Sequence, residues 1–145
     1  MTQTIRHRSA DVAVGYASDR TGRGIAYAAI ATGKGRAVAK IPFGLSPLPA
    51  LEGREVGYAA VAAVSAHLRG QGFTRVRLRI GDELVVDDLN ARRTVPPALA
   101  MAYVKTRCVL HGFALARVER AEPIETHELQ TRAHAELASR TAAAA

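Results

Sequence analysis

Two glycine-containing turns divide the first third of the chain into three short segments of alternating polarity. The turns span residues 19–24 and 32–35. In the first segment, Val12, Val14 and Tyr16 fall on one face of a strand. Short turns of this kind join neighbouring antiparallel strands. The sequence therefore predicts an antiparallel meander of three strands at residues 11–18, 25–31 and 36–43.

After this meander, the spacing of apolar residues changes from that of a strand to that of a helix. Val56, Ala60, Val64 and Leu68 recur every four residues within a predicted helix at 51–69. A helix between the third and fourth strands makes a parallel crossover possible. The remaining predicted elements are a strand at 73–80, a short helix at 83–90, a helix from Pro96, a strand at 113–119 and a helix at 126–140. We therefore predict an α/β fold, with a five-stranded mixed sheet of three antiparallel strands followed by parallel crossovers, flanked by helices.

Two local features make predictions about single residues. Asp82 precedes the short helix, where its carboxylate can accept hydrogen bonds from the first amides, so we predict that it is the N-cap. Met101, Val104 and Cys108 are predicted to form the apolar stripe of the next helix. Cys108 is the one cysteine of the chain, so it forms no internal disulfide, and it is predicted to be a small core residue.

The length of 145 residues predicts one domain, at 11–140. Residues 1–10 are predicted to be a flexible basic lead-in, and residues 141–145 a frayed alanine tail. No run approaches the roughly 20 apolar residues of a membrane span, and the N-terminus has no apolar segment typical of a signal peptide. The prediction is a cytoplasmic protein without a membrane partner.

Charge points to the kind of partner. The net charge is +7 and the isoelectric point about 10.3. A basic balance favours acidic partners such as nucleic acid. The five histidines and Cys108 show no spacing typical of a metal site, and the glycine-containing turns match neither phosphate-binding nor dinucleotide-binding motifs. The sequence therefore predicts no metal and no cofactor.

Four stretches, taken in order, resemble the ribonuclease H family. RIGDELVVDDLN at 79–90 is similar to the family pattern R-S-D-S-Q-L-V-V-x-Q-L-N. EVGYAAV at 55–61 resembles A-E-Y-x-A-L, GYASD at 15–19 resembles Y-T-D-G-S, and AHAELA at 133–138 resembles A-D-x-L-A. The likeness covers about residues 11–140. It implies a ribonuclease H fold, in which four carboxylates hold two divalent cations that hydrolyse a phosphodiester.

The same resemblance implies that this catalytic site has degenerated. The four carboxylate positions match Ser18, Gly57, Gly81 and Ala135. None of these residues supplies the charged oxygen ligands that hard divalent cations require. The resemblance therefore implies binding in place of catalysis.

A shifted metal site is the alternative interpretation. Asp19, Asp82 and Glu136 each follow a matched position by one residue, and Glu55 precedes one by two. A one-residue step turns a strand side chain to the opposite face, and it rotates a helical side chain by about 100°. A bulge after Ser18 can still turn Asp19 inward, so this alternative stays open.

Arginines mark the predicted contact surface. In the family, the loop after the first strand and the start of the first helix follow the nucleic-acid backbone, and arginine forks suit phosphates. The predicted phosphate contacts are Arg20, Arg23, Arg54, Arg79, Arg92 and Arg93. The opposing interpretation is that these arginines only keep an alanine-rich domain soluble.

Three functions follow from these observations. The first, which we favour, is a nucleic-acid-binding module that contacts the phosphates of RNA, DNA or a hybrid without metal. The second is a protein-interaction or self-assembly module, including a homo-oligomer, whose vacated cleft docks a partner. The third is a metal-dependent nuclease of RNA–DNA hybrids with displaced carboxylates.

Overall fold

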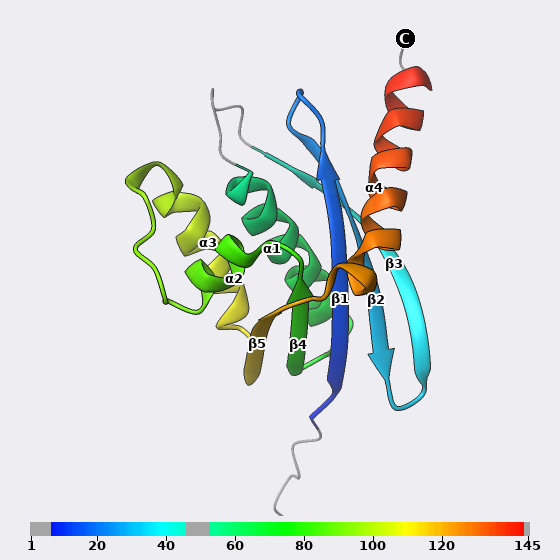
Figure 1. Cartoon of the computed structure of the whole chain (residues 1–145). Coiled ribbons are helices and arrows are strands. Elements are labelled where there is room, and N and C mark those ends of the chain that lie inside the picture. Colours follow the sequence, from blue (N-terminus) through cyan, green and yellow to red (C-terminus); the bar gives the residue numbers. More distant parts are fainter. Residues whose placement is uncertain (1–6, 46–52, 144–145) are drawn as a thin grey trace, which may run out of the picture.

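One five-stranded sheet organises the molecule (Figure 1). The computed structural model describes residues 7–45 and 53–143. The sheet has the strand order β3-β2-β1-β4-β5. Its elements along the chain are β1 (Ser9–Ser18), β2 (Arg23–Thr32), β3 (Gly35–Gly44), α1 (Arg54–Gly70), β4 (Arg75–Ile80), α2 (Glu83–Leu89), the 3-10 helix η1 (Pro97–Leu99), α3 (Ala100–Leu110), β5 (Leu115–Arg120) and α4 (Pro123–Ala143).

The predicted meander is confirmed. β1 and β2 pair antiparallel up to Ser18 opposite Gly24, and β2 and β3 pair antiparallel down to Thr32 opposite Gly35. Gly22 and Gly35 have φ angles of 87° and 128°, which favour glycine because it has no Cβ. Each strand is longer than predicted. β1 already begins inside the segment predicted as a lead-in, because Ser9 pairs with β4.

The parallel half of the sheet is confirmed as well. β4 pairs parallel with β1, with Ile80 beside Val14, and β5 pairs parallel with β4, with Arg120 beside Ile80. The carboxyl ends of β1, β4 and β5 therefore lie at the same edge of the sheet. In open α/β sheets this edge is where ligands commonly bind.

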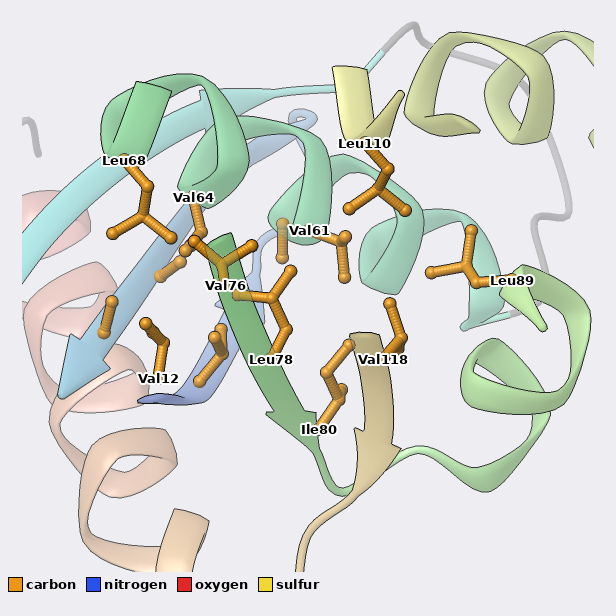
Figure 2. Packing of buried hydrophobic residues seen from close by; sticks show 14 of the residues in the cluster. Val12, Val61, Val64, Leu68, Val76, Leu78, Ile80, Leu89, Leu110 and Val118 are labelled. Atoms are coloured by element: carbon orange, nitrogen blue, oxygen red, sulfur yellow. The ribbon is translucent and has the colours of Figure 1, made fainter. Parts of the chain in front are cut away.

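Helices cover both faces of the sheet. α1, α2 and α3 lie on one face, where Val12, Leu78, Ile80 and Val118 pack beneath α1 (Figure 2). α4 covers β1 and β2 on the other face through a separate cluster that includes Ile25 and Leu129. Truncating a buried residue of this kind to alanine typically costs about 2–5 kcal/mol.

The predicted apolar stripe of α3 is wrong. Met101 is 73% exposed and Val104 53% exposed, and Cys108 is exposed instead of buried in the core. The helix instead turns Thr106 and Leu110 inward. The Thr106 hydroxyl lies 3.0 Å from the backbone oxygen of Tyr58 and donates to it, so a polar side chain holds α3 to α1.

Asp82 is the N-cap of α2, as predicted. Its Oδ1 accepts from the amides of Leu84 at 2.9 Å and Val85 at 3.3 Å. α4 runs from Pro123 to Ala143, past the predicted end at residue 140. The first six residues of the predicted lead-in, the first two residues of the helix predicted at 51–69 and the last two residues of the predicted tail lie outside the described residues. In the part of the chain that is described, no helix is long and apolar enough to cross a membrane.

Candidate functional site

A hollow of about 430 Å³ opens at the carboxyl edge of the three parallel strands. We call it the central hollow. Its walls come from the end of β1, the turn before α1, the residues after β4 and β5, and the first two turns of α4. The side chains on which its chemistry depends are Tyr16, Asp82, Arg120, Thr126, His127 and Gln130.

Tyr16 stands where β1 faces α1. A Cβ built on Gly57 would lie 2.9 Å from the Tyr16 hydroxyl and 2.6 Å from Cγ2 of Val85. Val85 is fully buried and cannot move aside easily. The phenol therefore fills the space that a longer side chain at position 57 would need.

The Tyr16 phenol is held in its neutral form. Burial raises its pKa above the ordinary value of 10.0, and the nearby Asp82 carboxylate raises it further. A neutral phenol is a poor ligand for a hard divalent cation, which prefers carboxylate oxygens. Tyr16 thus occupies the hollow without offering it a negative charge.

Gly81 forms the next part of the wall. A Cβ at this position would lie 3.4 Å from Oγ1 of Thr126, which is ordinary van der Waals contact. Gly81 is exposed to the hollow. Unlike position 57, this position has room for a side chain, but it carries none.

His127 and Ala135 differ in their relation to the hollow. His127, in the first turns of α4, lines it. Ala135 lies two helical turns further along and is exposed. Ser18 lies at the end of the β1–β2 pairing, opposite Gly24, and does not belong to the wall. Of the four matched positions, Gly81 lines the hollow itself. Gly57 does not line it but lies against Tyr16, which does.

The carboxylates proposed for a shifted metal site are scattered. Asp19 lies in the β1–β2 turn, where its Oδ1 accepts from the hydroxyl of Thr21 at 2.7 Å and the amide of Arg23 at 3.1 Å. These hydrogen bonds lower the pKa of Asp19, that of the Thr21 side chain contributing most. Its carboxylate thus orders the turn.

Glu136 and Glu55 also lie away from the hollow. Glu136 pairs with Lys40 at 3.2 Å and with Arg140 at 3.2 Å, and the Lys40 hydrogen bond is the main cause of its lowered pKa. Glu55 is buried beside a different cavity, between α1, α3 and β3. Asp82 alone among these four carboxylates lines the hollow, while it caps α2. No group of three or more His, Cys, Asp or Glu side chains in residues 7–45 and 53–143 is arranged to hold a metal ion.

Four of the six predicted arginines are exposed. Arg20 and Arg23 lie in the β1–β2 hairpin, and Arg92 and Arg93 follow α2. Arg92 lies 3.6 Å from Asp87 in an exposed pair. Arg20, Arg23 and Arg93 form no ion pair with any described carboxylate. These guanidinium groups therefore face solvent.

The other two predicted arginines hold the fold together. Arg54 is buried, and its Nη1 lies 3.2 Å from Oδ2 of Asp88, which is fully buried. Arg79 pairs with Asp11 at 2.9 Å and also with Glu125 at the start of α4. These contacts raise the pKa of Arg79, and the hydrogen bond that it donates to Asp11 has the largest effect. The guanidinium groups of Arg54 and Arg79 are therefore less exposed to solvent than those of Arg20 and Arg93.

The wall of the hollow has more hydrogen-bonding groups than ligands for a hard metal ion. Its wall carries a phenol, a hydroxyl, a carboxamide, an imidazole and a guanidinium against one carboxylate. Arg120 forms an ion pair with Glu83 at 3.5 Å, but both side chains are exposed, so the pair contributes little to stability. Such a wall suits a neutral or anionic polar group better than a divalent cation. Sequence reasoning missed Tyr16 and His127, although Tyr16 was already on the right face of its strand.

Solved structures share this architecture. The N-terminal ribonuclease H domain of Rv2228c from Mycobacterium tuberculosis matches 95% of this chain and 99% of its own, with 17% identity and a TM-score of 0.73. Ribonuclease H1 from the halophilic archaeon Halobacterium salinarum matches 88% of this chain and 98% of its own, with 18% identity and a TM-score of 0.70. LC11-RNase H1, solved in complex with an RNA/DNA hybrid, matches 86% of this chain and 91% of its own, with 14% identity and a TM-score of 0.58.

These similarities establish the fold. No protein-family model matches the sequence, and no curated protein matches it. The five-stranded mixed sheet with its four α-helices is a ribonuclease H fold, as the sequence resemblance implied.

Proposed function

We propose that this chain is a nucleic-acid-binding module that contacts backbone phosphates through exposed arginines and does not hydrolyse them by a two-metal mechanism. The observation that carries the proposal is the composition of the central hollow. Three of its features replace a carboxylate cluster: the neutral phenol of Tyr16, the bare backbone of Gly81, and the imidazole of His127. Position 57 is closed to longer side chains by Tyr16 and Val85.

This proposal revises two of the degenerate positions. Tyr16 lies on the same face of β1 as Ser18 but beside Gly57 and Gly81, where a first-strand ligand would have to stand. His127 lines the hollow from α4, whereas Ala135 lies beyond it. We therefore assign the four vacated positions to Tyr16, Gly57, Gly81 and His127.

The phosphate contacts are assigned to the arginines that face solvent. Arg20 and Arg23 extend from the β1–β2 hairpin, and Arg92 and Arg93 lie in the loop after α2. Arg54 and Arg79 are engaged by buried or partly buried carboxylates, and releasing them would cost part of the fold. The proposed contact set is therefore narrower than the six arginines expected from the sequence.

A displaced nuclease site has less support. Asp82 lines the hollow, but no second carboxylate joins it among the described residues. Two-metal hydrolysis needs several carboxylates at one place. A single aspartate does not provide that arrangement.

The test separates binding from cleavage. Fluorescently labelled duplex DNA, duplex RNA and RNA–DNA hybrid are titrated with the protein at several salt concentrations in EDTA. We expect association tighter than about 10⁻⁴ M near physiological salt, with affinity that falls as salt rises. The same hybrid is then incubated with Mg²⁺ and Mn²⁺, and we expect no cleavage. Cleavage that Asp82→Asn abolishes would overturn the degenerate-site proposal, and absence of binding in EDTA would overturn the nucleic-acid proposal.

One observation favours protein interaction as the second candidate. Met101, Val104 and Cys108 form an exposed stripe along α3. Single exposed apolar side chains are common on protein surfaces, but several side by side often mark a site of interaction with another protein. If no nucleic acid binds, a partner protein on this stripe becomes the better proposal.

A further inference from the structure

We propose that a second cavity, between α1, α3 and β3, binds a small organic cation with an apolar body, such as a primary alkylammonium or arylalkylammonium ion, through the carboxylate of Glu55. This cavity has a volume of about 340 Å³ and is separate from the central hollow. Nothing in the nucleic-acid proposal uses it. We call it the Glu55 cavity.

The walls of the Glu55 cavity are mostly apolar and small. Alanines of α1 and α3 line it, and Phe43, near the end of β3, and Leu45, just after β3, close it. Small side chains leave space that larger ones would fill. Its volume lies at the small end of the range of about 300–1,000 Å³ that is typical of ligand pockets.

Glu55 places a carboxylate in these apolar surroundings. The residue is 6% exposed, and its Oε2 is buried without a hydrogen-bond partner. No hydrogen bond or ion pair within residues 7–45 and 53–143 engages its carboxylate. Burial also raises its pKa above the usual value of 4.5.

Such a carboxylate calls for a cationic partner. An ionised group taken out of water without a partner costs several kcal/mol, and a charge-assisted hydrogen bond from an ammonium group offsets that cost. The apolar walls bury the carbon body of the same ligand and add the hydrophobic contribution. A cation with an apolar body satisfies both requirements at once, whereas an anion or a purely polar ligand satisfies neither.

Lys105 is the residue of this chain that competes for the role. It lies on the rim of the Glu55 cavity, on α3, and is exposed. Its ammonium group makes no ion pair with Glu55, whose Oε2 is buried without a partner. The Thr106 hydroxyl also lines the cavity but donates to a backbone oxygen. An external cation is therefore the partner that the cavity lacks.

The experiment uses hexylammonium as the probe and 1-hexanol as its neutral counterpart. Binding to the whole ¹⁵N-labelled chain is followed by chemical-shift changes of backbone amides. We expect saturable shifts confined to α1, α3 and the end of β3, and 1-hexanol should bind at least about tenfold more weakly because it lacks the charge. No saturation with hexylammonium up to about 10 mM would overturn the proposal.

Three variants test the roles of charge and space. Glu55→Gln should weaken hexylammonium binding by about tenfold or more while 1-hexanol binding is unaffected. Glu83→Gln is the matched control, because Glu83 also lies in the first turn of a helix but is exposed, and it should change nothing. Ala63→Leu should fill the cavity and exclude both probes while Glu55 stays in place.

The remaining outcomes are equally decisive. Lys105→Met should leave hexylammonium binding intact or tighten it, since it removes a competing cation. Loss of binding in Lys105→Met, or undiminished binding in Glu55→Gln, would overturn the assignment of the carboxylate as the recognition group. Binding that Ala63→Leu leaves unchanged would place the probe elsewhere and overturn the site.

Discussion

Arg54 and Asp88 form a buried ion pair, with Nη1 of Arg54 3.2 Å from Oδ2 of Asp88. The pair joins the first turn of α1 to the end of α2, and the Tyr58 hydroxyl donates to the same Asp88 oxygen. This geometry changes the role of an arginine that the sequence had placed in the phosphate-binding surface. The guanidinium of Arg54 neutralises a carboxylate inside the protein.

Replacing Arg54 by Met is expected to destabilise the fold. The fully buried Asp88 would lose the guanidinium that pairs with it, and breaking a buried pair in this way typically costs about 3–5 kcal/mol. Urea unfolding measures the loss. Arg92→Met is the matched control, since its pair with Asp87 is exposed, and it should change stability by no more than about 1 kcal/mol. Equal effects of the two substitutions would contradict the structural role of Arg54.

Placing a carboxylate in the central hollow should be tolerated at position 81 and should destabilise the fold at position 57. Gly57→Glu forces a Cβ to within 2.6 Å of Val85 and 2.9 Å of the Tyr16 hydroxyl. Overpacking of this kind costs about 1–3 kcal/mol, and the added charge costs more. Gly81→Asp meets only ordinary contact with Thr126 and should stay within about 1 kcal/mol of the parent.

Thermal and urea unfolding of both glycine variants provide the measurement. A stable Gly57→Glu protein would show that the Tyr16 and Val85 side chains move aside at little cost in free energy. In that case the contacts of position 57 would no longer support the proposal that the hollow cannot hold a carboxylate cluster.

The salt dependence of nucleic-acid binding should identify the contact surface. Replacing Arg92 and Arg93 by Ala should flatten the plot of log affinity against log salt, by roughly 0.9 for each phosphate of duplex DNA that is no longer neutralised. Affinity should fall similarly for all sequences, because backbone contacts position the protein without reading bases. Filter binding at four or more salt concentrations measures the slope.

The matched control for this experiment lies at the other end of the sheet. Lys34 and Arg36 are exposed in the β2–β3 hairpin, which points away from the β1–β2 hairpin (Figure 1). Lys34→Ala with Arg36→Ala removes the same charge, so its slope should stay at the parent value if Arg92 and Arg93 make the contacts. Equal flattening in both double variants would mean that general charge, and no particular surface, drives association.

The Glu55 carboxylate should make stability fall with rising pH. Its folded-state pKa lies above 4.5, so between 4.5 and the folded value the native state binds more protons than the unfolded chain. The contribution of Glu55 to stability is then fully present below pH 4.5 and is lost as the pH rises through the folded pKa. Glu55→Gln removes this dependence, and its stability relative to the parent should increase between pH 4 and pH 7. Urea unfolding at both pH values tests this, and a constant difference would show that Glu55 titrates normally.

The meander and the α2 cap were predictable because local chemistry decides them. Gly22 and Gly35 adopt φ angles that other residues avoid, and the Asp82 carboxylate bonds amides only two and three residues away. Spacing alone could not choose between two faces of α3. Met101, Val104 and Cys108 recur with the same intervals as Tyr103, Thr106 and Leu110, two residues later. The second set faces α1 because Thr106 bonds the backbone of Tyr58, a contact between residues 48 positions apart.

One part of the central hollow was also predictable, because local sequence determines it. The likeness around residues 79–90 located Gly81, because the strand and the capped helix fix its place. His127 was missed because a histidine among polar residues of a helix gives no sign that it lines a cavity, and only the packing of α4 on β1 brings it to the hollow. That packing depends on Gly15, since a Cβ there would lie 2.7 Å from the backbone carbon of Leu129.

The two cavities draw on different lengths of the chain. β1, β2 and β3 are joined by short turns, so they can pair as soon as the segment from Ser9 to Gly44 is available. The central hollow needs β4, β5 and α4 to reach β1 from as far as residue 130. The Glu55 cavity needs the end of β3 together with α1, η1 and α3. The central hollow also needs the last helix, whose first turns form part of its wall.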